Sequence, residues 1–200
     1  MIQAQLSSKI EGRIFPLLNF MEKYLKNTKQ IEITSYIKDV VRNFKQKDWT
    51  LVFEILSWIF NNFENIENDV EEKSKLFRKR TADEIIKSGK ATGCTDYAIA
   101  FIALARAKNI PTKYIEAIRK RWLDIGDDNH IEGHVFAECY VDNKWYIIDS
   151  QEGTVRTDYR RYVIYKKGLD SWDIGIKSFD DLKKKFLDFK KKYKTHLNIH

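Results

Sequence analysis

The order of patterns along the chain predicts an α+β fold with an antiparallel sheet. Through about residue 75, apolar residues recur three and four positions apart and glycine is almost absent, which favours helices. From about residue 112, segments rich in β-branched and aromatic residues indicate strands. Helices first and strands later is the order typical of this fold class. Hydrophobic residues make up 43% of the 200 positions, enough to fill one core.

We expect a single domain over residues 1–200, because no linker rich in Ser, Pro or Gly divides the chain. Its parts are a helical N-terminal layer (1–75), a central core (80–165) and a C-terminal amphipathic helix (178–195). The clearest helix of the first part is "WTLVFEILSWIFNNF" at 49–63, whose apolar residues form one broad stripe.

The core is expected to begin with a helix and to continue with strands. The helix starts at Cys94 and ends near Lys108 and Asn109, because Pro111 cannot continue it. Strands are expected at 112–118, 134–141, 144–149 and 155–165. Asp142 and Asn143 tolerate left-handed turn geometry and therefore predict a hairpin between the second and third strands.

The net charge of +7 includes a lysine-rich segment, "LKKKFLDFKKKYK", near the C-terminus. Its apolar residues recur at helical spacing, so a helix with a solvated lysine face is the preferred interpretation. Contact with nucleic acid or a membrane surface is the alternative, and it lacks the interleaved aromatic and basic residues of a base-stacking platform. No segment has the length of a signal peptide or membrane span, so we expect a cytoplasmic protein without membrane contact.

Cys94 has the sequence surroundings of a nucleophile. At the start of a helix, unpaired backbone N–H groups and the positive end of the helix dipole favour a thiolate. Gly93 immediately precedes it and would let a substrate backbone approach closely, which makes Gly93 a candidate substrate-binding residue. A buried structural thiol is the alternative for Cys94. The other cysteine, Cys139, points to the apolar face of its strand and is expected to be structural.

A thiol nucleophile needs a base, and the base needs an orienting group. His134 opens a strongly patterned strand and shares one face with Phe136 and Glu138, whereas the opposite face is apolar. With the turn at 142 and 143, paired positions add up to about 285, so Asp149 lies roughly opposite Phe136 and diagonal to His134. A carboxylate beside the imidazole is therefore expected.

Two segments, "GCTDYAIAFIALARAKNIPTKYIEAI" and "GHVFAECYVDNKWYIIDS", together resemble the transglutaminase-like superfamily. The resemblance covers roughly residues 80 to 150. Asn109 stands where many relatives have glycine and Ser150 where proline is usual, and both are compatible with turns. The matching positions are Gly93, Cys94, Asp96, Arg106, Ile110, Pro111, His134, Phe136, Glu138, Trp145 and Asp149.

The resemblance implies a papain-like fold and a catalytic triad of Cys94, His134 and Asp149. The expected function is a cysteine-dependent acyl-transfer enzyme that acts on peptide or carboxamide bonds of a protein or peptide substrate, with hydrolysis preferred. Transfer of the acyl group to an amine and a non-catalytic peptide-binding module on the same fold remain alternatives. The oligomeric state is not predicted.

Several further residues are candidates for substrate contact, ion pairing or metal binding. Trp122 lies in a polar loop leading to His134 and is a candidate substrate-binding residue, with surface packing equally expected. Glu138 is expected to pair with Arg106 or a lysine. We expect no cofactor and no metal. The carboxylates of the loop do not have calcium-motif spacing, and Cys94, His134 and Cys139 lack a fourth zinc ligand. The loop oxygen donors are Asp124, Asp127, Asp128, Asn129 and Glu132.

Overall fold

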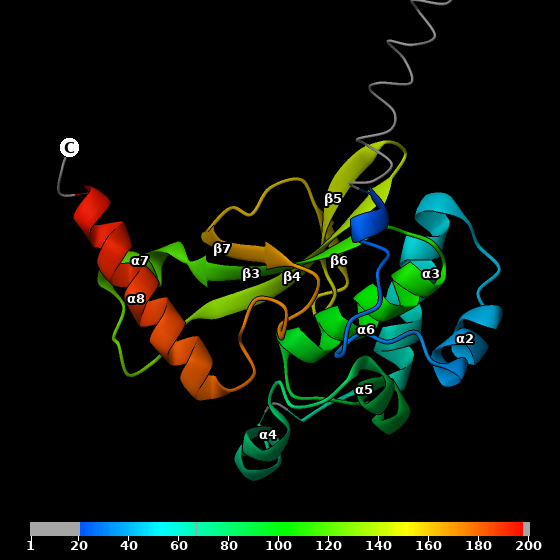
Figure 1. The fold of residues 1–200 in the computed structure, drawn as a ribbon, viewed down its shortest axis with the longest axis horizontal. Helices are drawn as coiled ribbons and strands as arrows, with labels where there is room; N and C mark the ends of the chain where they lie inside the picture. The colour runs from blue at the N-terminus through cyan, green and yellow to red at the C-terminus, as the bar shows by residue number, and fades with distance from the viewer. Residues whose placement is uncertain (1–20, 67, 198–200) are drawn as a thin grey trace, which may run out of the picture.

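A five-stranded antiparallel sheet forms the centre of the protein, with its strands in the order β6–β5–β4–β3–β7 (Figure 1). The computed structural model describes residues 21–66 and 68–197, so the first 20 residues of the predicted helical layer (1–75) lie outside it. The central strands are β3 (Thr112–Arg119), β4 (Gly133–Val141), β5 (Lys144–Asp149), β6 (Thr154–Arg156) and β7 (Tyr162–Gly168).

Helices cover the sheet in two groups (Figure 1). The helix α6 lies against β3 and β4 and is enclosed by α2, α3 and α5, whereas α7 and α8 lie together at the other end of these strands. The sequence prediction of α+β architecture is thereby confirmed. The helices are α2 (Ser35–Arg42), α3 (Asp48–Asn62), α4 (Val70–Leu76), α5 (Ala82–Ser88), α6 (Cys94–Ala107), α7 (Lys120–Ile125) and α8 (Phe179–Leu197).

The central helix α6 is buried on all sides. Every residue from Thr95 to Arg106 is buried, which agrees with a sequence that is apolar around the whole helix. Gly93 precedes the helix with φ 138°, a backbone conformation that favours glycine. The chain leaves the helix at Asn109, which has φ 61°, just before Pro111. Only the two end residues of α6, Cys94 and Ala107, are partly exposed.

The β4–β5 hairpin has the predicted turn and register. Asp142 and Asn143 both have positive φ, 50° and 62°. Ala137 pairs with Ile148 and Cys139 with Tyr146, which is the register expected from the turn position. The last residue of β5 therefore ends beside the beginning of β4.

The predicted strand at 155–165 is in fact two strands on opposite edges of the sheet. The strand β6 pairs with β5, whereas β7 pairs with β3. Between them, the Asp158 carboxylate accepts a hydrogen bond from the backbone N–H of Arg160 (2.9 Å), which has φ 44°. The segment around this turn carries the chain from one edge of the sheet to the other, so β6 and β7 run in the same direction but do not pair. A short parallel pair, β1 (Glu64–Asn65) with β2 (Lys90–Ala91), was not predicted.

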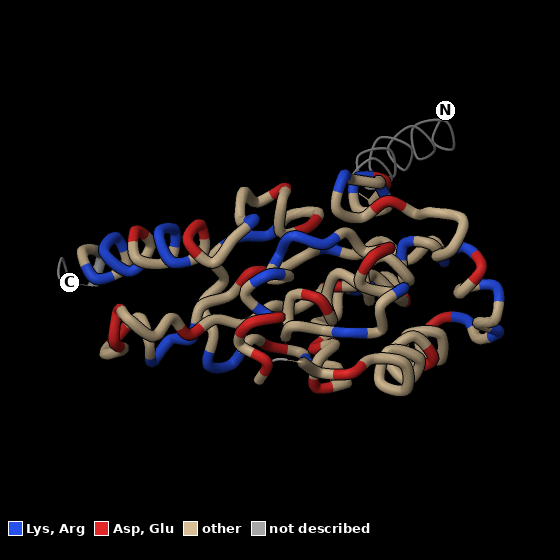
Figure 2. Tube along the Cα trace, turned by 90° about the horizontal axis from the view of Figure 1, so that it is seen from below, with Lys and Arg blue, Asp and Glu red and all other residues tan. Residues whose placement is uncertain are grey.

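The predicted C-terminal helix is observed as α8, and lysines run along it (Figure 2). Its apolar face is buried: Phe186 is fully enclosed and contacts the rings of Trp122 and Tyr165. Lys190 departs from the expected solvated face, because its side chain is only 6% exposed and its Nζ lies 2.6 Å from an Asp128 carboxylate oxygen. Among the residues described, no helix is long and apolar enough to cross a membrane.

Candidate active site

A cleft of about 710 Å³ opens at the start of α6. Cys94 and His134 both line it, together with residues of α4 and of the first turn of α8. Much of its wall is apolar, which suits it to hold an uncharged segment of a ligand. The apolar lining residues are Val70, Phe77, Ile131, Phe179 and Leu182.

Cys94 lies at the mouth of the cleft, and hydrogen bonds and an ion pair fix the start of its helix. The Asp96 carboxylate accepts hydrogen bonds from the backbone N–H of Thr92 (2.8 Å) and from its hydroxyl (2.7 Å). The same carboxylate oxygen binds Arg80 Nη2 at 2.7 Å. The backbone N–H groups of Cys94 and Thr95 belong to the first turn, where no intrahelical acceptor exists. They are thus positioned to donate to an anion beside the sulfur.

His134, the second residue of β4, connects Cys94 to Asp149. Its Nε2 lies 2.9 Å from Asp149 Oδ1. Because Nε2 is engaged there, Nδ1 is the ring nitrogen left for Cys94, which lines the same cleft and raises the pKa of His134. The imidazole is flanked by the rings of Phe136 (4.7 Å between centroids) and Tyr162 (5.6 Å). The structure therefore brings together the three residues predicted to form a triad.

The surroundings of His134 favour its protonated form. Burial opposes the charge on the ring, but the hydrogen bonds to Asp149 and Cys94 outweigh it and raise the pKa of His134 to about 10. At neutral pH the ring is therefore an imidazolium that can donate a proton in either direction.

Asp149 is fixed at the end of β5 by more than the histidine. The side chain is almost fully buried, and Oδ2 lies 2.9 Å from Arg156 Nη2. Oδ1 also accepts a longer hydrogen bond (3.4 Å) from the backbone N–H of Glu152. Sequence reasoning missed Arg156. The only available signal was its place on a strand following Asp149.

A buried ionic cluster forms another wall of the cleft. The guanidinium of Arg78 binds both carboxylate oxygens of Glu116, at 2.7 and 2.9 Å. The Tyr114 hydroxyl donates to Glu116 at 2.8 Å. Burial opposes the charge of Arg78, but Glu116 more than offsets this and raises the pKa of Arg78, and Cys94 contributes in the same direction. Nothing in the sequence marked this pair, because its members are far apart in the chain and belong to no local motif.

Residues 35–150 match the sequence model of the transglutaminase-like superfamily. The chain belongs to this superfamily. No curated protein matches the sequence.

Two solved structures are similar to this chain. A protein from Cytophaga hutchinsonii, described as "a Putative Cysteine Protease", is 22% identical, with a TM-score of 0.60 over 76% of this chain. The match spans 48% of that protein, so this chain covers about half of its length. A second structure, described as "a TGase", is 17% identical, with a TM-score of 0.41 over 62% of this chain and 34% of its own. The first match shows that the fold is shared.

Neither of the two residues predicted to bind substrate is part of the lining of the cleft. Trp122 is fully buried in α7, where its indole N–H donates to the Asp127 carbonyl (2.9 Å) and its ring packs against Phe186. This placement corrects its assignment as a substrate contact, because α8 covers the ring. Gly93 is also buried and is absent from the cleft lining. Its observed role is to adopt the positive φ that starts α6.

Glu138, Arg106 and the carboxylates of the loop before His134 have structural partners. Glu138 binds Lys113 (3.0 Å) and Lys167 (2.6 Å), so the lysine alternative is confirmed and the pairing with Arg106 was wrong. Arg106 instead donates to backbone carbonyls, including that of Thr112 (2.8 Å). Of the loop carboxylates, those of Asp124, Asp128 and Glu132 face Lys120, Lys190 and Arg119. Across the described part of the chain, no group of three or more His, Cys, Asp or Glu residues is arranged to hold a metal.

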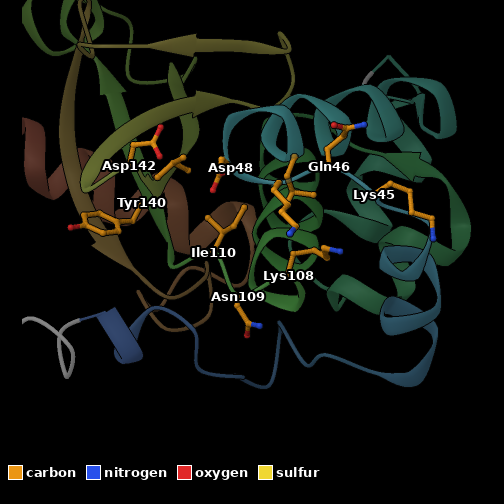
Figure 3. Close-up of a pocket in the computed structure, with 11 residues that line it drawn as sticks. Lys45, Gln46, Asp48, Lys108, Asn109, Ile110, Tyr140 and Asp142 are labelled. Atoms are coloured by element: carbon orange, nitrogen blue, oxygen red, sulfur yellow. The ribbon is translucent and has the colours of Figure 1, made fainter.

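A separate hollow of about 470 Å³ lies between the start of α3, the end of α6 and the end of β4. Figure 3 shows that its residues spread over these elements rather than converging on one point. Lys108 is held there by a hydrogen bond from its Nζ to the Phe44 carbonyl (3.1 Å). The lining contains no thiol or imidazole. We therefore assign the chemistry to the cleft at Cys94.

Proposed function

We propose that this protein is a cysteine-dependent acyl-transfer enzyme that hydrolyses peptide or carboxamide bonds. The observation that carries the proposal is the position of His134, which hydrogen-bonds Asp149 and lines an open cleft together with Cys94. A nucleophile, a base and an orienting carboxylate in this succession form the arrangement that acyl transfer requires.

In the first half of the reaction, the Cys94 sulfur attacks the carbonyl carbon of the substrate. His134 holds the proton that the leaving amine will receive, since its raised pKa keeps the ring an imidazolium at neutral pH. A C–S bond forms and the carbonyl oxygen becomes an oxyanion, which the N–H groups of the first turn of α6 stabilise. The C–N bond then breaks, and the departing amine takes the proton from His134, leaving a thioester.

In the second half, water attacks the thioester. It gives one proton to His134, the C–S bond breaks, and the Cys94 thiolate and the imidazolium are restored with release of a carboxylic acid. Asp149 holds the ring orientation throughout and stabilises its positive charge. An amine can replace water in this step, in which case the product is a new amide. The relative that is described as a cysteine protease supports hydrolysis as the proposed outcome.

The proposal is tested by mass spectrometry after incubation of the protein with a peptide library and a primary amine. Cleaved or deamidated peptides are expected with the wild type, and peptides joined to the amine would instead identify transfer. Cys94→Ala removes the attacking sulfur, so turnover should fall by at least about 10³-fold.

The matched control is Cys139→Ala, which removes the other thiol and should leave turnover in place. Turnover that persists in Cys94→Ala, or a wild type that changes no peptide, would contradict the proposed function.

A further inference from the structure

A second hollow, of about 530 Å³, lies on the other side of His134 from the apolar cleft. It shares Gly133 and His134 with the cleft, but Cys94 is not part of its lining. It is therefore a separate space that meets the reaction site at the proton donor. We call it the arginine pocket, after four of its lining residues, Arg119, Arg156, Arg160 and Arg161.

The charge of the arginine pocket is predominantly positive. Four guanidinium groups line it against two carboxylates, those of Asp149 and Glu152. The Asp149 carboxylate is already engaged by Arg156 and His134. The pocket therefore offers more cationic than anionic groups to a ligand.

The remaining arginines retain hydrogen-bonding capacity. Arg119 Nε lies 3.5 Å from Glu132 and Arg160 Nε lies 3.6 Å from Asp158, so each carboxylate occupies one edge of a group with five N–H donors. Arg161 forms no ion pair within the described residues. Guanidinium groups with free donors bind carboxylates in bidentate fashion.

The two spaces on either side of His134 thus differ in chemistry. On the Cys94 side, aromatic and aliphatic groups such as Phe77, Phe179 and Leu182 line the cleft, and its charged residues are of both signs. They are Lys73, Arg78, Lys79, Glu116 and Asp180. On the other side lie the arginines. In the proposed reaction the acyl group stays bonded to Cys94 in the cleft, and the leaving amine lies beside the His134 nitrogen that protonates it. A substrate segment that continues beyond this amine, past the ring, would reach the arginines.

We propose that the arginine pocket binds an Asp or Glu side chain on the leaving-group side of a peptide substrate. This assignment rests on the proposed acyl-transfer function and names its substrate class, namely peptides with an apolar segment before the reacting carbonyl and an acidic residue after it. Arg160 and Arg161 are the specificity-determining residues, because both are exposed and neither contacts the triad.

The test uses two peptides that differ only in Glu or Gln after the reacting bond. Their binding to the Cys94→Ala protein is measured by calorimetry, where no reaction can interfere. The Glu peptide should bind about tenfold more tightly, and the preference should weaken as salt is added. In the double variant Arg160→Gln/Arg161→Gln, built on Cys94→Ala, the preference should fall to about twofold or less.

A charge-matched control removes two lysines from the exposed face of α8, in Lys184→Gln/Lys191→Gln. This variant loses the same charge and should keep the preference. A location control uses the wild type, in which the Glu peptide should slow iodoacetamide modification of Cys94 at concentrations where the Gln peptide does not.

The outcomes separate the two proposals. Equal binding of both peptides overturns the arginine pocket, as does a preference that survives in the arginine variant or disappears equally in the lysine variant. The acyl-transfer function fails on a different result, namely a Cys94 that reacts with iodoacetamide no faster than free cysteine.

Discussion

The two cysteines of this protein occupy opposite kinds of environment. Cys94 begins α6, is partly exposed in the cleft and faces His134. Cys139 lies in the middle of β4 with no exposed surface, and burial raises the pKa of its thiol to about 12. The same side chain is thus placed to react at one position and to pack at the other.

The difference shows that the surroundings decide the role of a thiol. Alternation along β4 sends Val135, Ala137 and Cys139 into the main core, whereas His134 and Phe136 belong to the opposite face. Of the two cysteines, Cys94 is the one at which a helix start, an imidazole and a carboxylate meet. Each prediction below changes one of these surroundings, from the largest expected effect to the smallest.

Asp149→Asn should have the largest effect of these changes. An amide cannot stabilise the imidazolium as a carboxylate does, so we expect kcat/KM to fall by about 10² to 10⁴-fold. Arg156→Gln should have a smaller effect of the same kind. It keeps the carboxylate and removes the group that holds its second oxygen, so a fall of about tenfold is expected. A neutral effect of Asp149→Asn would show that His134 needs no orienting carboxylate.

Gly133→Ala should displace His134, the proposed base, without changing its side chain. An added Cβ would lie 2.6 Å from Phe186 Cε2 and 3.1 Å from the Ala117 carbonyl, so α8 or the start of β4 must move. Overpacking of this kind costs about 1–3 kcal/mol. The melting temperature and kcat/KM should both fall. Adding Phe186→Leu should restore part of each. Unchanged activity in Gly133→Ala would mean that this contact does not position His134.

The raised pKa of His134 predicts how stability depends on pH. The value is about 10 in the folded protein and about 6.5 in an unfolded chain, so the charged ring stabilises the fold fully below pH about 6.5. This contribution is lost as the pH rises towards 10. The difference in unfolding free energy between the wild type and His134→Gln should therefore shrink between pH 6 and 10. A difference that grows over this range would contradict the assignment.

Cys139→Ala should have the smallest effect. The substitution leaves a small cavity in the core and should lower the unfolding free energy by about 1 kcal/mol. It should not change kcat/KM, because the side chain points away from the cleft. A large loss of activity would break the contrast between the two cysteines.

Local patterns made much of this arrangement predictable. The turn residues Asp142 and Asn143 set the hairpin register, and the register places Asp149 near His134. Pro111 and the apolar run before it bounded α6. These features depend on residues that are close in sequence, where backbone geometry and side-chain alternation leave few choices.

Long-range contacts could not be predicted in the same way. The pairing of Arg78 with Glu116 and the packing of α8 over Trp122 depend on how separate elements meet in space. The sequence around Trp122 is polar and loop-like, and it would be the same whether the side chain faced a cleft or packed under a helix. Likewise, the turn at Asp158 and Arg160 divides what composition alone presents as one strand.

The most direct test of the account is the rate at which iodoacetamide modifies each cysteine at pH 6 in the folded protein. The account predicts that Cys94 reacts well above the rate of free cysteine, whose thiol has a pKa of about 8.5. It also predicts that His134→Gln removes this advantage and that Cys139 stays unmodified. A Cys94 that reacts no faster than free cysteine, or that is indifferent to His134→Gln, would contradict it.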